Sequence, residues 1–519
     1  MSVELEIRCL GFSREALVAE IAKASRGDPS VTEGIAQVRY LGSYLSHRDS
    51  GAKSMVVEHP YVDRHYLEEY TGYYANTFDP PPPKATRIHF FTRELTDEGL
   101  AKKLQEASSG GFQNARASLQ DAYLGFVVVR PLASAPIGRT TLRPFSGVED
   151  RNFGPPILPH SVHLAGIPLK VDGIPFQQQD RAVGACATAA VWSALARTIR
   201  ADGGRAPTPL AVTVAATGRK ITGRVLPAED GLDVEQICAS IHDFGYSPFL
   251  LKAAFEPEQA LMALKCYLRS GIPVVLHLGL TEEGHAVTAV GFRESDAEDD
   301  PPAIEMELTP SHRLVTKGIS RLYVHDDRLG PYARMRVRLE ARPEATAAAG
   351  GAGRRNLELR VQAWPYEAGF EKFETSGTVW ALIAPLYPKL RLSAAHLLAS
   401  AGELLPPLKS CLTEVEREQL RVDTWFQHGS DYLKSLMSAP AGVSPDRIAR
   451  LARRAWPRYV GLIRFGLGKR PLVDMVCDTT DIPRDDVSPL LVVLPYRQGD
   501  IDRLRDVLSV GPSRKAFFG

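Results

Sequence analysis

The middle of the chain alternates helix-favouring and strand-favouring segments in a fixed order, and this order constrains the fold most. The segment 187–198 is rich in alanine, which favours a helix. The apolar runs 273–280 and 285–292 are typical of buried strands, and 320–327 is a further strand-like run. Helices and strands interspersed in this way must pack as layers around a common core, so the sequence predicts an α+β fold.

Cys186 stands immediately before the alanine-rich segment and has the context of a nucleophile. A thiol attacks as its thiolate, although a free thiol titrates near about 8.5. At a helix N-terminus, unpaired N–H groups and the helix dipole favour an anion. Gly184 permits a tight turn into that helix. The alternative role for a cysteine at this position is that of a small buried hydrophobic residue.

A base and an orienting carboxylate follow on the strand-like segments. His285 begins a predicted buried strand directly after a glycine and is the candidate general base. Asp326 and Asp327 end another strand, so either carboxylate could hold the ring nitrogen that faces away from the thiol. Strand alternation places Asp326 on the face of Leu322 and Val324, which we expect to point inward. Asp326 is therefore preferred, with Asp327 as the alternate.

A tetrahedral oxyanion also needs hydrogen-bond donors. The backbone N–H of Cys186 is one candidate, and a glutamine side chain upstream is the other. Gln179 is the preferred glutamine, and Gln178 is the alternate.

These segments together resemble a known family. They resemble the papain-like cysteine peptidase fold in five features, which follow in chain order. These are a glutamine-containing segment before a cysteine helix, a GLxxEQ helix ending in glycine, GIPVVL, GHAVTAVGF and a strand ending in Asp326. The resemblance covers about residues 170–390 and is closest to bacterial double-glycine leader peptidases of bacteriocin transporters. It implies that Cys186 is the nucleophile, His285 the base and Asp326 the orienting residue. In the family the oxyanion glutamine usually stands six residues before the cysteine, where this chain has Asp180.

The length of 519 residues predicts several domains. We expect an α+β N-terminal domain over 1–150, and a helical then β C-terminal region over 391–519. Between them, 155–390 would form the papain-like domain, with an N-terminal helical lobe that carries the nucleophile helix and a C-terminal antiparallel β lobe. The low-complexity segment 345–355 is expected at the tip of a long hairpin, since both flanks resemble strands. A linker between domains is the alternative.

Composition excludes several classes of protein. With 62 Lys and Arg against 61 Asp and Glu, the net charge of +1 argues against binding to nucleic acid or membranes through bulk charge. No apolar run approaches the roughly 18–20 residues of a membrane helix, and the start of the chain lacks the apolar stretch of a signal peptide. The scattered cysteines, without a CxxC pair, fit a reducing compartment. We expect a cytoplasmic, bacterial protein without nucleic-acid or membrane partners.

The resulting prediction is a cysteine peptidase or amide hydrolase that acts on a protein or peptide through a thioester, with flanking regions that bind a substrate or partner protein. One alternative is a catalytically inactive papain-like binding module in a larger assembly. The other is an acyltransferase of the transglutaminase type, which uses the same triad.

A metal site was the remaining possibility for these strands. His277 and His325 fall near His285 and the two aspartates in the predicted sheet. No HxH or HExxH spacing supports metal ligation, so the sequence predicts neither a metal nor a cofactor.

Overall fold

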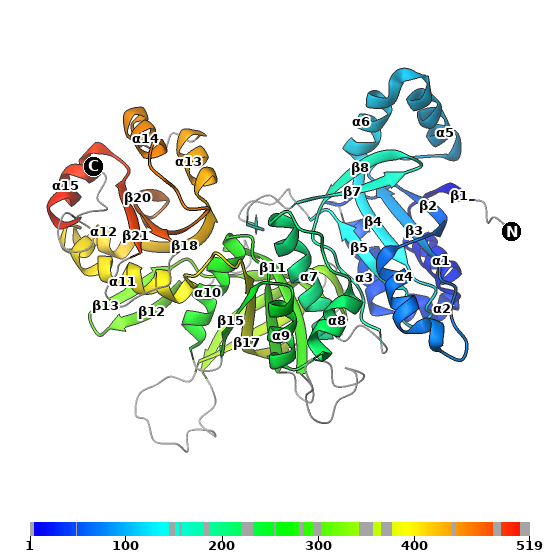
Figure 1. Cartoon of the computed structure of the whole chain (residues 1–519), viewed down its shortest axis with the longest axis horizontal. Coiled ribbons are helices and arrows are strands. Elements are labelled where there is room, and N and C mark those ends of the chain that lie inside the picture. Colours follow the sequence, from blue (N-terminus) through cyan, green and yellow to red (C-terminus); the bar gives the residue numbers. More distant parts are fainter. Residues whose placement is uncertain are drawn as a thin grey trace, which may run out of the picture.

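The computed structural model is a mixed α+β fold in which a central region lies between an N-terminal and a C-terminal region (Figure 1). Among the residues that it describes, none of the helices combines the length and apolar character needed to cross a membrane. The described residues are 5–47, 49–144, 151–154, 158–180, 186–218, 232–253, 256–279, 284–294, 303–341, 357–364, 376–438, 442–480 and 489–508.

The N-terminal region is built on an antiparallel sheet in the order β1–β2–β3–β4–β5. Asp63 accepts hydrogen bonds from the N–H groups of His65 and Tyr66, and this caps the start of α4. The strands are β1 (Glu6–Gly11), β2 (Ser54–Tyr61), β3 (Ala85–Phe91), β4 (Tyr123–Val129) and β5 (Ile137–Leu142). The α-helices are α1 (Arg14–Ser25), α2 (Pro29–Gly34), α3 (Ala36–Ser46), α4 (Arg64–Gly72), α5 (Asp97–Glu106) and α6 (Phe112–Ala122).

A hairpin of β7 (Pro159–Leu164) and β8 (Ile167–Asp172) follows the N-terminal sheet and packs against it. Gln120 of α6 exchanges two hydrogen bonds with the backbone of Lys170, at 2.8 and 2.7 Å. The expected domain boundary near 155 falls before this hairpin, whereas the hairpin contacts the N-terminal region. Residues 151–152, which precede the hairpin, pair instead with a strand of the central sheet, so the chain contacts both regions around the expected boundary.

The central region holds a sheet whose strands form a ring. The order is β10–β11–β14–β15–β16–β17, and β17 pairs again with β10, while β9 adds to β17 and β6 to β11. The strands are β6 (Arg151–Asn152), β9 (Ser247–Leu251), β10 (Val274–Gly279), β11 (Gly284–Arg293), β14 (Arg321–Asp326), β15 (Gly330–Ala341), β16 (Leu357–Trp364) and β17 (Ser376–Leu386). The helices are α7 (Cys186–Ala201), α8 (Pro209–Thr217), α9 (Val234–Asp243) and α10 (Pro257–Arg269).

Two hairpins belong to the central region. Strands β15 and β16 pair antiparallel from Arg334 opposite Trp364 to Ala341 opposite Leu357. This pairing confirms the predicted hairpin, although 345–355 itself lies outside the described residues. A second hairpin of β12 (Ile304–Thr309) and β13 (His312–Thr316) reaches to the C-terminal region, where β13 lies against α11 and β18.

The C-terminal region is an antiparallel sheet in the order β18–β19–β20–β21, with helices before and between its strands. The expected order of helices followed by strands holds only in part, because two of the helices lie between β18 and β19 and a helix follows the last strand. The strands are β18 (Leu420–His428), β19 (Tyr459–Leu467), β20 (Arg470–Asp478) and β21 (Leu490–Pro495). The helices are α11 (Ala394–Ser410), α12 (Glu414–Gln419), α13 (Gly429–Ser438), α14 (Pro445–Ala452) and α15 (Gln498–Leu508).

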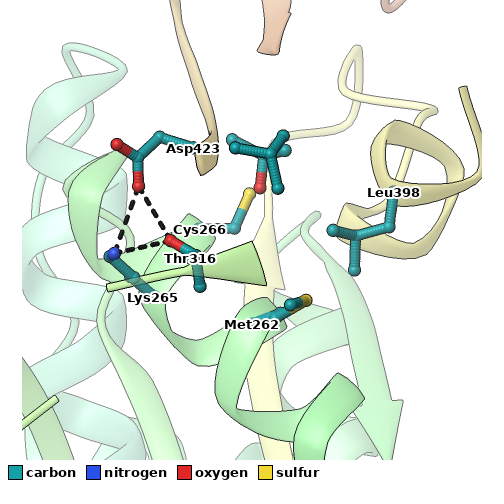
Figure 2. A pocket seen from close by; sticks show the side chains of 8 residues that line it. Met262, Lys265, Cys266, Thr316, Leu398 and Asp423 are labelled. Atoms are coloured by element: carbon teal, nitrogen blue, oxygen red, sulfur yellow. Dashed lines mark hydrogen bonds and ion pairs between the residues drawn. The ribbon is translucent and has the colours of Figure 1, made fainter. Parts of the chain in front are cut away.

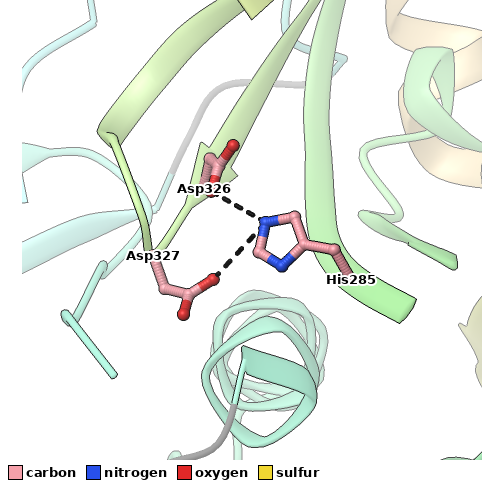
Figure 3. A group of neighbouring side chains, drawn as sticks. All are labelled: His285, Asp326 and Asp327. Carbon is pink, nitrogen blue, oxygen red and sulfur yellow. Dashed lines mark hydrogen bonds and ion pairs between the residues drawn. The ribbon is translucent and has the colours of Figure 1, made fainter. Parts of the chain in front are cut away.

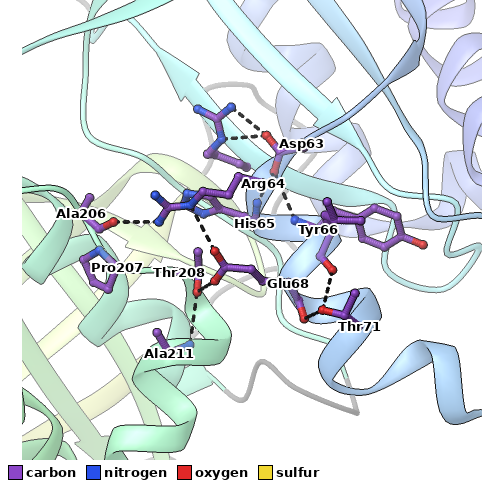
Figure 4. A network of polar contacts seen from close by, with 12 residues as sticks. Asp63, Arg64, His65, Tyr66, Glu68, Thr71, Ala206, Pro207, Thr208 and Ala211 are labelled. Atoms are coloured by element: carbon purple, nitrogen blue, oxygen red, sulfur yellow. Dashed lines mark hydrogen bonds and ion pairs between the residues drawn. The ribbon is translucent and has the colours of Figure 1, made fainter.

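The N-terminal region docks on the central region partly through α4 and α8 (Figure 4). Arg64 donates from Nη2 to the carbonyl of Ala206 at 2.9 Å. Thr208, which caps α8, donates its hydroxyl to the carboxylate of Glu68. A single hydrophobic cluster continues from the N-terminal helices through α7 and the central sheet to α11 and β18–β20, so all three regions share one core.

The C-terminal region docks on α10 through buried charge (Figure 2). Lys265 of α10 lies 3.1 Å from Asp423 of β18 and 3.0 Å from Glu294, and donates to the hydroxyl of Thr316 at 2.8 Å. Arg269 also pairs with Asp423 at 3.1 Å. A space of about 10 Å³ remains among these side chains, enough for about one water molecule.

Candidate active site

The predicted nucleophile helix is present, and Cys186 is the first residue of α7. Residues 187–199 are all buried, so α7 is a core helix. Cys186 itself is only half-buried and forms no disulfide. The thiol therefore lies where the helix N-terminus leaves the core, while Gly184 is outside the described residues.

His285 and Asp326 meet across the central sheet (Figure 3). His285 is the second residue of β11, and Asp326 is the last residue of the neighbouring strand β14. The ring nitrogen Nε2 of His285 lies 2.9 Å from Oδ1 of Asp326, and both side chains are buried. The same carboxylate oxygen accepts the N–H of Arg328 at 3.0 Å, which fixes its position. Because Thr288 of β11 donates to the carbonyl of Ala190, this strand is held directly against α7.

The charge balance at this pair favours an imidazolium. Burial of the ring opposes its positive charge and by itself would lower the pKa of His285. The nearby Asp326 carboxylate outweighs this effect and, together with Cys186 and Asp327, raises the pKa of His285 to about 10. Burial likewise opposes ionisation of Asp326, while the positive ring of His285 holds the pKa of Asp326 below its usual range. The pair is therefore a buried ion pair at neutral pH.

The second ring nitrogen of His285 is left for the thiol. Nδ1 is buried and has no hydrogen-bond partner of normal geometry among the described residues. Nε2 is engaged by Asp326, and the Cys186 thiol contributes to the raised pKa of the same ring, so a carboxylate and a thiol both lie near the imidazole. This is the order of groups that a thiol nucleophile, a base and an orienting acid require.

Asp327 lies next to the pair but is not hydrogen-bonded to it. Its Oδ1 is 3.9 Å from Nε2 of His285, whereas Asp326 is 2.9 Å away. Neither carboxylate oxygen of Asp327 has a hydrogen-bond partner in the described part of the chain, and the residue is only 3% exposed. Burial raises the pKa of Asp327 to about 7 against the opposing effect of His285. The geometry thus separates the two predicted alternatives, with Asp326 in hydrogen-bonding position.

The two candidate oxyanion glutamines have different surroundings. The side-chain oxygen of Gln178 accepts the N–H of Ile137 at 3.1 Å, so this buried amide is engaged by β5. Gln179 is half-buried and stands one residue closer to Cys186. Gln179 therefore stays the preferred candidate, and its role in an oxyanion hole stays a prediction.

Asp180, at the position where the family has its glutamine, takes part in a buried network. Arg130, which follows β4, donates from Nη1 to Asp180 at 3.0 Å and to Glu69 at 3.2 Å. Its Nη2 donates to the carbonyl of Gln178 at 3.0 Å, and Gln177 donates to Glu69 at 2.6 Å. Burial raises the pKa of Glu69 to about 7 although Arg130 opposes the shift. Asp180 is thus used to anchor the segment that leads to Cys186.

The N-terminal region also contacts the turn that follows Asp326. Gln37 of α3 donates to the carbonyl of Asp327 at 2.6 Å, and the hydroxyl of Tyr40 donates to the carbonyl of Pro331 at 3.0 Å. The ring of Tyr40 lies so close to Gly330 that a Cβ there would come within 2.0 Å of it. These contacts were not predicted, because partners 290 residues apart leave no local signal in the sequence.

The other two histidines considered for a metal site lie elsewhere. His325 is buried, donates from Nδ1 to the carbonyl of Pro175 at 3.2 Å, and has its pKa lowered to about 3 by burial. His277 packs edge-on against Trp380, with ring centroids 5.4 Å apart. The group of potential ligands that the described residues do bring together is His285, Asp326 and Asp327.

Comparisons with protein-family models, with curated proteins and with solved structures find no match to this chain. The interpretation of the site therefore depends on its own geometry.

Proposed function

We propose that the chain is a cysteine peptidase or related amide hydrolase with a papain-like central region, acting on a protein or peptide. The observation that carries the proposal is the buried His285, which is bound to Asp326 through Nε2 and interacts with the Cys186 thiol at the start of α7. The three residues come from a helix and two strands that are far apart in the sequence but were predicted together as a triad.

In the resting state of the proposed site, the thiol proton of Cys186 has already passed to Nδ1 of His285, which gives a thiolate–imidazolium pair in keeping with the raised pKa of His285. The thiolate sulfur attacks the carbonyl carbon of an amide, and the carbonyl oxygen becomes an oxyanion. His285 then gives its proton to the leaving amine, the C–N bond breaks and a thioester remains. A water molecule, deprotonated by His285, hydrolyses the thioester and restores the thiol.

The surroundings of His285 support this cycle. A carboxylate 2.9 Å from Nε2 stabilises the imidazolium that forms when the thiol loses its proton, and holds the ring in one orientation. The N-terminus of α7 favours the thiolate at the same moment. Gln179 and the N–H of Cys186 are the proposed donors to the oxyanion.

The test is alkylation of the native protein with iodoacetamide from about pH 5 to about pH 9, with peptide mass spectrometry of every cysteine. We expect Cys186 to react fastest, with a half-point well below that of a free thiol, and His285→Ala to abolish this advantage. Cys238 is the matched control, because it is also half-buried and burial raises the pKa of its thiol.

An inert Cys186, or one that titrates like an ordinary thiol, would reject the nucleophile and favour the inactive binding module. A reactive Cys186 would justify a substrate search with peptides in the presence and absence of a primary amine. Transfer of the acyl group to the amine in preference to water would identify an acyltransferase.

A further inference from the structure

A buried carboxylate beside the proposed triad has no function in the reaction described above. Asp327 is 3% exposed, and neither of its oxygens has a hydrogen-bond partner among the described residues. Figure 3 shows its carboxylate pointing to the imidazole of His285. A buried carboxyl group normally has hydrogen-bond partners, because its desolvation is otherwise too costly, and the ion-pair contact of Asp327 with His285, at 3.9 Å, is shared with Asp326.

The side chains around Asp327 offer further ligand atoms of the same kind. Nε2 of His285 and one carboxylate oxygen each from Asp326 and Asp327 lie within 4.8 Å of one another. Two ligands of one zinc ion, each at about 2.1 Å, are at most about 4.2 Å apart, so small side-chain rotations would close the set. One imidazole nitrogen and two carboxylate oxygens are ligands that Zn²⁺ accepts readily.

We propose that His285, Asp326 and Asp327 form an inhibitory Zn²⁺ site within the candidate active site. The ion would take the place of the proton on Nε2 of His285, which passes to solvent, and its two charges would neutralise the two carboxylates. Water is the fourth ligand. Only the inhibitory effect of zinc rests on the proposed function. The ligand set is defined by the buried cluster itself.

The consequence for catalysis follows from the two ring nitrogens. With Zn²⁺ on Nε2, the neutral ring carries its remaining proton on Nδ1, the nitrogen left for Cys186. It can then donate a hydrogen bond to the thiolate but cannot accept the proton of the thiol. Zinc would therefore stop general-base catalysis while leaving the fold intact, and removal of the ion would restore activity.

Zinc binding can be measured without any activity. The protein with Cys186→Ala, which lacks the proposed nucleophile, is titrated with Zn²⁺ by calorimetry and with Co²⁺ by visible absorption. We expect one ion per chain with nitrogen and oxygen ligation. Adding Asp327→Asn should weaken binding by about 10–100-fold or more, the range seen even when outer partners of metal ligands are lost. This isosteric change also removes a buried charge, so folding should be retained.

His277→Asn is the matched control, because His277 is a nearby histidine that packs against Trp380 outside the cluster. It should leave zinc affinity unchanged. Equal affinity with and without Asp327→Asn, loss of binding in His277→Asn, or no binding at all would overturn the zinc site. None of these results bears on Cys186 alkylation, so failure of the zinc site and failure of the proposed function are distinguishable.

Discussion

The N-terminal and C-terminal regions both pack on the central region, but they contact different parts of it. The N-terminal region contacts the segment before Cys186 through Arg130 and the turn after Asp326 through Gln37. The C-terminal region contacts α10 through Lys265 and Asp423, and Arg458 pairs with Asp202 just beyond the end of α7 opposite Cys186. The two regions therefore support different parts of the central region.

This difference indicates that the proposed active site is larger than the central region. At two segments that carry site residues, backbone carbonyls accept hydrogen bonds from side chains of the N-terminal region, those of Gln37 and Arg130. The C-terminal region belongs to the same hydrophobic cluster, but its ion pairs, Lys265 with Asp423 and Arg458 with Asp202, lie on α10 and beyond the end of α7 opposite Cys186. We infer that the N-terminal region positions the site, and the following predictions test this contrast from the largest expected effect to the smallest.

Arg130→Met should have the largest effect. It leaves Glu69 and Asp180 buried without their shared cation, and breaking a buried ion pair from one side costs about 3–5 kcal/mol of unfolding free energy. Equilibrium denaturation measures this loss. In protein that is still folded, the fast alkylation of Cys186 should also decline, because the segment leading to it is no longer anchored. Unchanged alkylation would show that the N-terminal region does not position the site.

Lys265→Met is the corresponding change at the C-terminal interface. Asp423 keeps its pair with Arg269, so we expect a smaller loss of about 1–3 kcal/mol, typical of a disrupted buried polar contact. The alkylation rate of Cys186 should stay at the parent value. A decrease as large as that in Arg130→Met would remove the distinction between the two regions.

Glu69→Gln tests the same network through pH. Glu69 titrates near 4.5 when unfolded and near about 7 when folded, so between these values only the native state holds the proton. The unfolding free energy should therefore fall as pH rises through this window, by at most about 1.4 kcal/mol per unit. Glutamine removes this contribution. The loss of unfolding free energy between pH 5 and pH 7 should therefore be smaller in the variant, by on the order of 1–2 kcal/mol. Asp327 retains a similar slope, so part of the pH dependence should remain.

The sequence predicted the elements that carry local signals. The GLxxEQ helix is α9, which begins with a capping box of Asp233 and Gln236, and the alanine-rich helix predicted over 187–198 is α7, which spans Cys186–Ala201. The two apolar runs are the adjacent antiparallel strands β10 and β11, with Leu278 opposite His285. In each of these cases, hydrophobic periodicity or a cap specifies the structure within a few residues.

The network around Arg130 could not be predicted in this way. Its partners Glu69 and Asp180 are 61 and 50 residues away, and nothing in their local sequence distinguishes them from surface charges. Asp180 is notable in the sequence only by comparison with the papain-like pattern, and the structure places it in a buried ion pair with Arg130. Alternation along β14 favoured Asp326 over Asp327, whereas the unpartnered state of Asp327 depends on packing from several elements.

Gln37→Met gives the smallest expected effect and tests the contact between α3 and the turn after Asp326. Gln37 donates to the buried carbonyl of Asp327 at 2.6 Å, and loss of one such hydrogen bond costs about 0.5–1.5 kcal/mol. Tyr40→Phe is the matched control, because it removes a hydrogen bond of the same type to Pro331, four residues further along the turn. If α3 positions the carboxylates, Gln37→Met should lower the alkylation rate of Cys186 more than Tyr40→Phe at equal loss of stability. Equal rates in the two variants would limit the positioning function of the N-terminal region to Arg130 and the segment that leads to the nucleophile.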